Sequence, residues 1–263
     1  MLEYVFFQRA LAAAVLVGLL CGLLGFFVVL RRLAFVGVGI SHSAMGGVAI
    51  GLLAGWNPAL AATVFAILMA LGMFWVGRDG RLSEDAVIGV FFSGAMALGL
   101  VLLSLRHGFQ QDLFAYLFGS VLAISGAELA GLLVLVVLLG AVVLAAFSEL
   151  LFLSFDEEVA RAYGRPVDAM NALLLVVLAI TVVAGIRVVG VLLIEALLVV
   201  PAATAALWTL DFRRQVAISM GLGAGSGVLG LIGSYVFDVT AGGSIVLVAV
   251  VFFFVSLLVR RGT

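Results

Sequence analysis

The sequence predicts an all-α polytopic membrane protein, and its composition, its long apolar runs and the placement of its arginines all support that fold class. Of its 263 residues, 66% are hydrophobic and 10% are charged, whereas soluble domains are roughly 45–50% apolar and about 25% charged. A soluble fold of this length could not hide so much apolar surface from water. The mean hydropathy of +1.40 therefore excludes a soluble enzyme, a disordered chain and a nucleic-acid-binding module.

Nine apolar runs are long enough to cross a bilayer, which takes about 20 mostly apolar residues. We therefore expect about nine transmembrane helices, with eight as the alternative count. Asn57 and Pro58 mark one helix start, because Asn caps helix N-termini and Pro suits the first helical position. The expected spans cover approximately residues 6–30, 36–54, 59–76, 86–105, 127–147, 169–186, 188–208, 215–234 and 244–259.

A shorter apolar run at 113–124 has about a dozen residues, too few to cross a bilayer, and we expect a re-entrant or interfacial helix there. The arginines support this interpretation. Nine spans with an external N-terminus leave only Arg9, Arg106 and Arg187 outside or at a span edge, in agreement with the positive-inside rule. The internal arginines are then Arg31, Arg32, Arg78, Arg81, Arg161, Arg165, Arg213, Arg214, Arg260 and Arg261. A tenth span at 113–124 would move the last six of them outside, so we expect a cytoplasmic C-terminus.

Small residues recur at the spacing that lets membrane helices approach closely. The chain has 32 glycines, about 12% against a usual ~7%, although membrane helices also tolerate glycine without any packing role. The single cysteine, Cys21, excludes an internal disulfide framework and is expected to be a small apolar side chain in a helix. The glycine sets at this spacing are Gly18/Gly22, Gly47/Gly51/Gly55, Gly221/Gly225 and Gly223/Gly227.

One sizeable polar insertion, 148–168, falls between the fifth and sixth spans on the internal side. Ser154 and Glu157 fit the S-x-x-E capping box, acidic residues follow where they complement the helix dipole, and Gly164 supplies a C-terminal stop. The pattern predicts a short helix near 155–164 that lies outside the membrane. An ordinary connecting loop is the alternative.

Two ionisable residues lie well inside the expected spans, away from their ends, and a charge at the centre of a span costs about 2.5–3.5 kcal/mol. His42 could offer an imidazole to a passing divalent ion, and Glu195 precedes Pro201, which should bend its helix. At 1.5 Å per residue, His42 lies roughly 9 Å from the internal edge and Glu195 roughly 10 Å from the external edge. The alternatives to metal contact are that His42 makes a structural hydrogen bond and that Glu195 is buried and protonated. As metal ligands, the two residues could share one site or form two successive sites along the transport path.

Three further polar residues lie at the expected outer edge of the membrane. Asp112 and Glu128 are better explained by solvation there, and His107 by a solvated loop. Weak capture of a metal ion near Asp112 and His107 is the functional alternative.

Five stretches, in order along the chain, are similar to motifs of ABC metal-ion permeases. They are RRLAFVG with SHSA at 31–44, DLFAYLFG at 112–119, DEEVARAYG at 156–164, VGVLL through ALLVVPAATA at 189–205, and Asp238 with the following Ala-Gly at 241–242. The chain resembles the permease subunits of zinc/manganese ABC importers, nearest the bacterial high-affinity zinc-uptake permeases. This resemblance runs from the first loop to the last span.

The resemblance implies a single transmembrane permease domain, 1–263, in the plasma (inner) membrane of a prokaryote. It implies a homodimer in the lipid bilayer, a cytoplasmic ABC ATPase, an extracytoplasmic metal-binding protein, and alternating access driven by ATP. The cargo would be zinc, with manganese or iron as alternatives, and no cofactor would be bound permanently. The coupling helix that meets the ATPase would comprise Asp156, Glu157, Glu158, Val159, Ala160, Arg161, Ala162, Tyr163 and Gly164.

The chain departs from the family pattern at the expected metal site. The Asp usually found four residues before the His is Val38, while Glu195 stands where a small or hydroxyl residue is usual. We therefore hypothesise that Glu195 replaces the missing carboxylate near His42. Asp112 and Asp238 are weaker candidates for metal contact.

The chain has no lysine and no G-x-x-x-x-G-K-[ST] phosphate loop, so it is not expected to be an enzyme; ATP would reach it only through the partner. The alternative function is an ion-coupled secondary transporter that uses His42 and Glu195, a class that often carries broken helices. An intramembrane enzyme built on Ser41 or Ser43 lacks a recognisable nucleophile setting.

Overall fold

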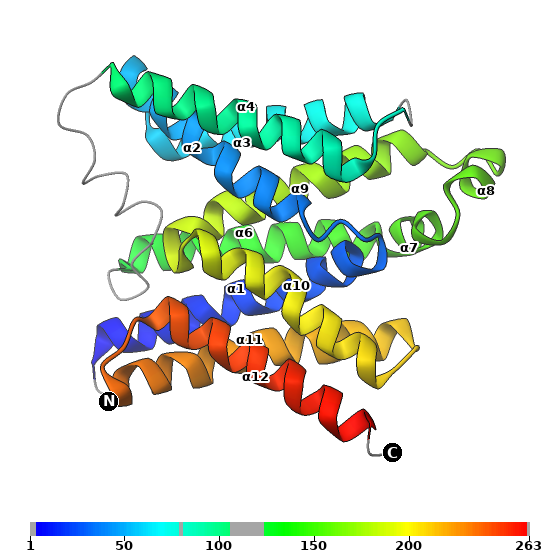
Figure 1. Cartoon of the computed structure of the whole chain (residues 1–263). Helices are drawn as coiled ribbons and strands as arrows, with labels where there is room; N and C mark the ends of the chain where they lie inside the picture. Colours follow the sequence, from blue (N-terminus) through cyan, green and yellow to red (C-terminus); the bar gives the residue numbers. More distant parts are fainter. Residues whose placement is uncertain (1–3, 79–80, 106–123, 262–263) are drawn as a thin grey trace. The chain divides into compact units, whose positions relative to one another are not determined.

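The computed structural model describes residues 4–78, 81–105 and 124–261, and the regular structure in those ranges is α-helical. Eight of the described helices are long and apolar enough to cross a membrane, and a shorter apolar helix covers Leu193–Trp208. The predicted fold class is confirmed. The helices are α1 (Val5–Leu30), α2 (Val36–Ala54), α3 (Pro58–Gly77), α4 (Glu84–Ser104), α6 (Gly126–Ala145), α7 (Phe147–Phe155), α8 (Glu157–Ala162), α9 (Val167–Val189), α10 (Val191–Trp208), α11 (Phe212–Phe237) and α12 (Ala241–Arg261) (Figure 1).

The described helices form two compact units. One holds α1, α6, α10, α11, α12 and the last residues of α9, from Gly185 onward; the other holds α2, α3, α4, α7, α8 and α9 as far as Ala184. His42 belongs to the second unit and Glu195 to the first. The expected re-entrant helix at 113–124 lies, apart from its last residue, outside the described residues.

In the first unit, α1 and α11 pack backbone against backbone. A Cβ atom added at Gly18 would lie 2.5 Å from the carbonyl oxygen of Gly223, and one added at Gly22 would lie 2.6 Å from Ser219 O. The buried Ser219 hydroxyl also donates a 2.7 Å hydrogen bond to the carbonyl of Gly22. Because lipid gives helices no hydrophobic reason to associate, such close contacts and interhelical hydrogen bonds hold them together.

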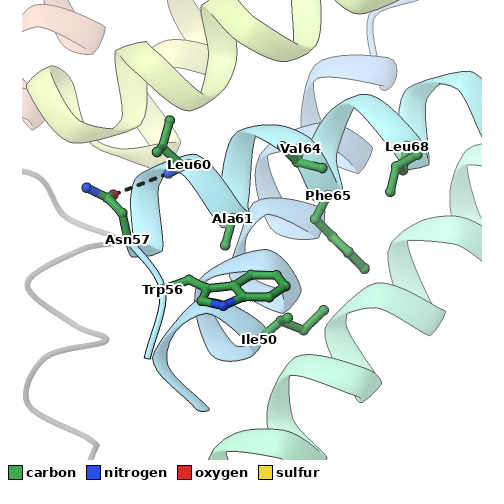
Figure 2. Close-up of a pocket in the computed structure, with 8 residues that line it drawn as sticks. All are labelled: Ile50, Trp56, Asn57, Leu60, Ala61, Val64, Phe65 and Leu68. Atoms are coloured by element: carbon green, nitrogen blue, oxygen red, sulfur yellow. Dashed lines mark hydrogen bonds between the residues drawn. The ribbon is translucent and has the colours of Figure 1, made fainter. Parts of the chain in front are cut away.

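In the second unit, α2 packs on α3 and α4. A Cβ at Gly47 would lie 2.6 Å from the Cα of Ala62. The absence of a side chain at Gly47 therefore allows the backbones of α2 and α3 to come this close. The turn between α2 and α3 follows the sequence prediction: the Asn57 side chain accepts hydrogen bonds from the backbone N–H groups of Ala59 and Leu60, at 3.0 and 3.3 Å. Figure 2 shows this cap beside the side chains of α3.

The glycine prediction holds for only part of the predicted set. Gly221 has nothing within 4 Å of a Cβ, and Gly225 has only an ordinary contact with a phenylalanine ring. Gly55 has a different role, because its φ of 70° places it in the left-handed region that ends α2. Spacing alone identifies glycines that can pack closely, but it does not say which face of a helix meets a neighbour.

We expect a Gly18→Ala substitution to lower the midpoint of thermal unfolding in detergent. The nearest atoms to the added methyl group are backbone atoms of α11, which cannot move aside without separating the helices, and overpacking of this kind costs about 1–3 kcal/mol. Gly221→Ala, on the same helix pair but in open space, is the matched control and should unfold at or above the wild-type temperature. Equal midpoints for the two variants would contradict the packing role of Gly18.

Candidate functional site

The insertion between α6 and α9 contains two short helices rather than the single helix predicted near 155–164. Ser154 lies inside α7, where its hydroxyl donates to the carbonyl of Leu150 at 2.6 Å, and it caps nothing. The N-cap of α8 is Asp156, whose carboxylate accepts a 2.9 Å hydrogen bond from the N–H of Val159. The capping-box prediction was wrong by two residues, because Asp156 offers a carboxylate acceptor at the point where the backbone becomes extended, two residues after Ser154.

The C-terminal end of α8 agrees with the sequence prediction. Gly164 has a φ of 71°, and its N–H donates to the carbonyl of Arg161 at 3.0 Å. The left-handed turn that stops the helix is the conformation that glycine adopts at least cost.

One face of α8 is buried and the other is exposed. Ala160 is fully buried in a small apolar cluster with Leu153 of α7 and Val167 of α9. On the other face, Val159 is 41% exposed and Tyr163 is 77% exposed. Apolar and aromatic side chains left in water on a short, well-capped helix are typical of a surface that a partner protein covers.

Polar contacts fix α8 to its neighbours. Arg161 pairs with Asp168 of α9 at 3.0 Å, and Asp168 also pairs with Arg78, the C-cap residue of α3, at 3.3 Å. Glu157 accepts a 2.9 Å hydrogen bond from the side chain of Asn171. The two arginines are about half exposed (52% and 55%), so each pair contributes only about 0–1 kcal/mol to stability.

A second ion pair of the same kind lies nearby. Arg165, in the segment that joins α8 to α9, pairs with Glu149 of α7 at 2.6 Å. A hollow of about 410 Å³ also runs along α8 and is lined by Glu157, Glu158, Arg161 and Ala162. The predicted partner-binding residues 156–164 are therefore together on one ordered surface, although Ala160 is buried beneath it.

His42 lies in the seventh position of α2 and is half-buried. Its Nδ1 is 3.0 Å from the carbonyl oxygen of Val38. The Ser41 Oγ lies 3.2 Å from the same nitrogen. In the tautomer that carries its proton on Nδ1, this nitrogen donates to the Val38 carbonyl and the lone pair is on Nε2. The ring also packs edge-on against Phe92 of α4, with centroids 5.0 Å apart. Nε2 is the nitrogen that can bind a metal ion in that tautomer.

Val38 therefore helps to orient His42 through its backbone. At the position where the resemblance leads one to expect a carboxylate, the chain supplies a backbone carbonyl oxygen and an apolar side chain. The same oxygen also accepts a hydrogen bond from the Ser41 hydroxyl at 3.0 Å. In many metal sites an acceptor of this kind fixes the tautomer of a ligating histidine.

Glu195 lies in the second turn of α10 and is half-buried. α10 begins after Gly190, whose φ of 87° turns the chain back from α9. Close contacts hold this part of α10 in place: a Cβ at Gly185 would collide with the side chain of Ile194, and one at Gly25 of α1 would collide with the carbonyl of Leu198. The neighbourhood of Glu195 is thus tightly packed, with Pro201 inside the helix two turns further on.

Two of the weaker candidates for metal contact, Asp238 and Glu128, lie at helix ends. Asp238 is exposed and has a φ of 51°, which makes it the left-handed C-cap of α11; aspartate is enriched in that conformation. Glu128 is exposed, and its carboxylate accepts hydrogen bonds from the N–H and the hydroxyl of Ser125, completing a capping box at the start of α6. Asp112 and His107 lie outside the described residues.

Within the described ranges, His, Cys, Asp and Glu side chains form no cluster of three or more that could hold a metal ion. A groove of about 390 Å³ between the end of α2 and α3 is lined mainly by apolar side chains, among them Trp56, Leu60 and Val64 (Figure 2). Leu60 and Val64 are exposed on α3, a span that we expect to face lipid, and Trp56 is exposed in the turn before it. The groove offers no ligand for a cation beyond the Asn57 amide, which caps α3.

A body of membrane-spanning helices with a short capped helix between two spans defines a transmembrane transport subunit that can engage a partner outside the membrane. The profile of the ABC 3 transport family matches residues 3–260. The chain belongs to this family, and it is the transmembrane subunit of an ABC system rather than its catalyst. This membership decides against the secondary transporter and the intramembrane enzyme considered from the sequence.

Several relatives align with nearly the whole chain. The manganese transport system membrane protein MntC of Listeria monocytogenes is 35% identical over 258 residues, covering 98% of this chain and 92% of the relative. The manganese import system permease protein ScaB of Streptococcus gordonii is 36% identical, covering 97% and 91%. The solved structure of PsaBC from Streptococcus pneumoniae in complex with a Fab is similar with a TM-score of 0.85 and 35% identity, covering 97% of this chain and 91% of that chain.

We expect Asp156→Ala to loosen α8 without unfolding the protein. Loss of an N-cap costs a helix about 1 kcal/mol, which corresponds to roughly fivefold faster amide exchange of the residues that follow, 159–163. Ser154→Ala is the matched control, because Ser154 bonds only within α7. Hydrogen–deuterium exchange measured by mass spectrometry distinguishes the two, and faster exchange in S154A than in D156A would restore Ser154 as the cap.

Proposed function

We propose that the protein is the permease subunit of an ATP-driven importer for divalent metal ions, and that α8 is the helix its ATPase binds. The observation that carries the proposal is the structure of α8: a capped helix with Val159 and Tyr163 exposed and Ala160 buried beneath them. Such a helix presents a shaped surface while it stays attached to the spans. Membership of the ABC 3 transport family supplies the kind of partner.

The proposed assembly follows from the same family. Two copies of the chain would form the membrane body, each with an ATPase on its cytoplasmic side, and an extracytoplasmic binding protein would deliver the ion. The arginine distribution supports a cytoplasmic α8 and C-terminus. The membrane would be the plasma membrane of a prokaryote.

We propose manganese as the cargo. The resemblance to zinc-uptake permeases led us to expect zinc, which also binds nitrogen ligands more tightly than manganese does. MntC and ScaB, two relatives that align over almost the whole chain, carry manganese in their names. A carboxylate suits manganese and an imidazole suits zinc, so zinc is the ion against which manganese transport must be compared.

His42 and Glu195 are the proposed ligands on the path. The Val38 carbonyl oxygen lies 3.0 Å from Nδ1 of His42, the kind of contact that supports a ligating histidine in many metal sites. Glu195 is proposed because an acid within a membrane span is costly unless it serves a function. Asp112 and Asp238 are retained as weaker sites of contact.

Val159→Asp should abolish ATP-driven uptake. The change places a charge on the exposed face of α8, yet aspartate is well tolerated in the first turn of a helix, so α8 itself should remain folded. We expect the variant to lose its ATPase on purification, and proteoliposomes that contain it to take up manganese no faster with ATP than without.

Leu210→Asp is the matched control, because Leu210 is 89% exposed and lies on the same expected side of the membrane, outside α8. It should retain both the ATPase and uptake. Uptake by the wild type without ATP, or retention of the ATPase by V159D, would contradict the proposed function. Zinc supplied at equal concentration should compete poorly; preferential zinc uptake would restore the expectation from the sequence.

His42→Ala and Glu195→Gln should each slow manganese uptake by about tenfold or more, since changes in metal ligands and their supports typically cost 10–100-fold in affinity. ATPase binding should be unaffected in both variants. If the two residues hold one ion together, uptake by the double variant should be little slower than uptake by either single variant. If they form two successive sites, the fold-reductions in uptake of the single variants should multiply in the double variant.

Ser43→Ala and Glu128→Gln are the controls for this pair. Ser43 bonds to Gly39 within its own helix, and Glu128 caps α6. Wild-type uptake by E195Q would remove Glu195 from the path. A loss in S43A as large as that in H42A would point to a structural role for this part of α2.

A further inference from the structure

Asp168 lies where three helix ends meet. It is in the first turn of α9, and its two carboxylate oxygens contact arginines from two other helices: Oδ1 with Arg161, in the last turn of α8, at 3.0 Å, and Oδ2 with Arg78, at the end of α3, at 3.3 Å. The carboxylate therefore bridges the short helix that we propose as the ATPase site and a membrane span.

Helix dipoles strengthen this arrangement. The carboxylate stands at the positive end of α9, whereas Arg161 and Arg78 stand at the negative ends of α8 and α3. Each charge therefore suits its own helix as well as its partner. Charge joins all three ends, and Ala160 of α8 also packs with Val167 of α9 in the apolar cluster described above. The pair of Asp168 with Arg78 is therefore the contact that can break and re-form without opening that cluster.

The contact at Arg78 continues into the helices that carry His42. α3 packs closely on α2 through Ala62 and Gly47, and α2 positions His42. A line of direct contacts therefore leads from α8 through Asp168 and α3 to α2. By contrast, the neighbouring pair of Arg165 and Glu149 joins the α8–α9 segment to α7.

We propose that Asp168 is a positioning residue that transmits movement of α8 to α3 and thereby couples ATP hydrolysis to transport. The inference rests on the proposed docking of the ATPase at α8, and it assigns to Asp168 a role that docking does not require. Because the two pairs are half-exposed and weak, their loss should affect coupling while leaving stability almost unchanged.

The test uses proteoliposomes that contain the permease with its ATPase, and measures manganese ions taken up per ATP hydrolysed. Asp168→Asn and Arg78→Gln should each lower this ratio about fivefold or more, the usual lower range of coupling between sites. The double variant should be no worse than either single variant, because both remove the same link. Arg78→Lys, which keeps the charge, should recover part of the ratio.

Three measurements separate transmission from a merely structural role. Thermal unfolding midpoints and recovery of the ATPase on purification should match the wild type in every variant. Glu149→Gln, which removes the neighbouring ion pair of similar exposure, should keep the wild-type ratio. If D168N fails to fold, R78Q tests the same link from α3.

A wild-type ratio in both D168N and R78Q would overturn the inference, as would an equal fall in E149Q. Its failure is distinguishable from failure of the proposed function. Retention of the ATPase by V159D shows that α8 is not the docking site. Loss of the ATPase by V159D together with a wild-type ratio in D168N shows that α8 docks the ATPase but that Asp168 does not transmit its movement.

Discussion

The close approach of helix backbones in a medium without water is the constraint on which this structure depends. In lipid, apolar side chains gain nothing by leaving the solvent for a neighbour, so association must come from van der Waals contact and hydrogen bonds at short range. Gly18 and Gly223 meet in this way, and Gly227 packs against Ala14. The hydrogen bond from Ser219 to Gly22 adds a polar contact inside the same interface. α10 and α12 then pack on this α1–α11 pair.

Polar groups follow the same constraint. Backbone hydrogen bonds are satisfied within helices, and serine and threonine hydroxyls in the spans mostly return to carbonyls one turn back, as Ser43 and Thr204 do. Charged residues gather instead around α8. The ionisable side chains of His42 and Glu195 break this pattern. An ionisable group in a span is costly, and the proposed function accounts for both residues as ligands of a passing ion.

Most of the fold could be predicted from the sequence, because hydrocarbon imposes length and hydropathy on every span. The nine apolar runs correspond to nine helices within a few residues at each end, and the cap at Asn57 was predicted correctly. The nine-residue α7 was missed, since its run of apolar residues is too short to stand out and was included in a polar insertion. Ser154 was chosen over Asp156 because both fit a capping pattern, and only the backbone conformation distinguishes them.

The candidate site was less predictable, for a related reason. Residue identity indicated His42 and Glu195, but the role of Val38 lies in its backbone carbonyl, which no side-chain pattern reveals. The bridge at Asp168 depends on Arg78, 90 positions earlier in the chain, and only tertiary structure brings such residues together.

The two proposed ligands on the path, His42 and Glu195, belong to different units. A site that conducts an ion must bind it well enough to admit it and weakly enough to release it. A single oriented imidazole in one unit and a single carboxylate in the other can each give an ion partial coordination, with water or backbone oxygens completing the shell. Tight binding is then the task of a separate delivery protein, while the permease supplies contacts that a conformational change can break.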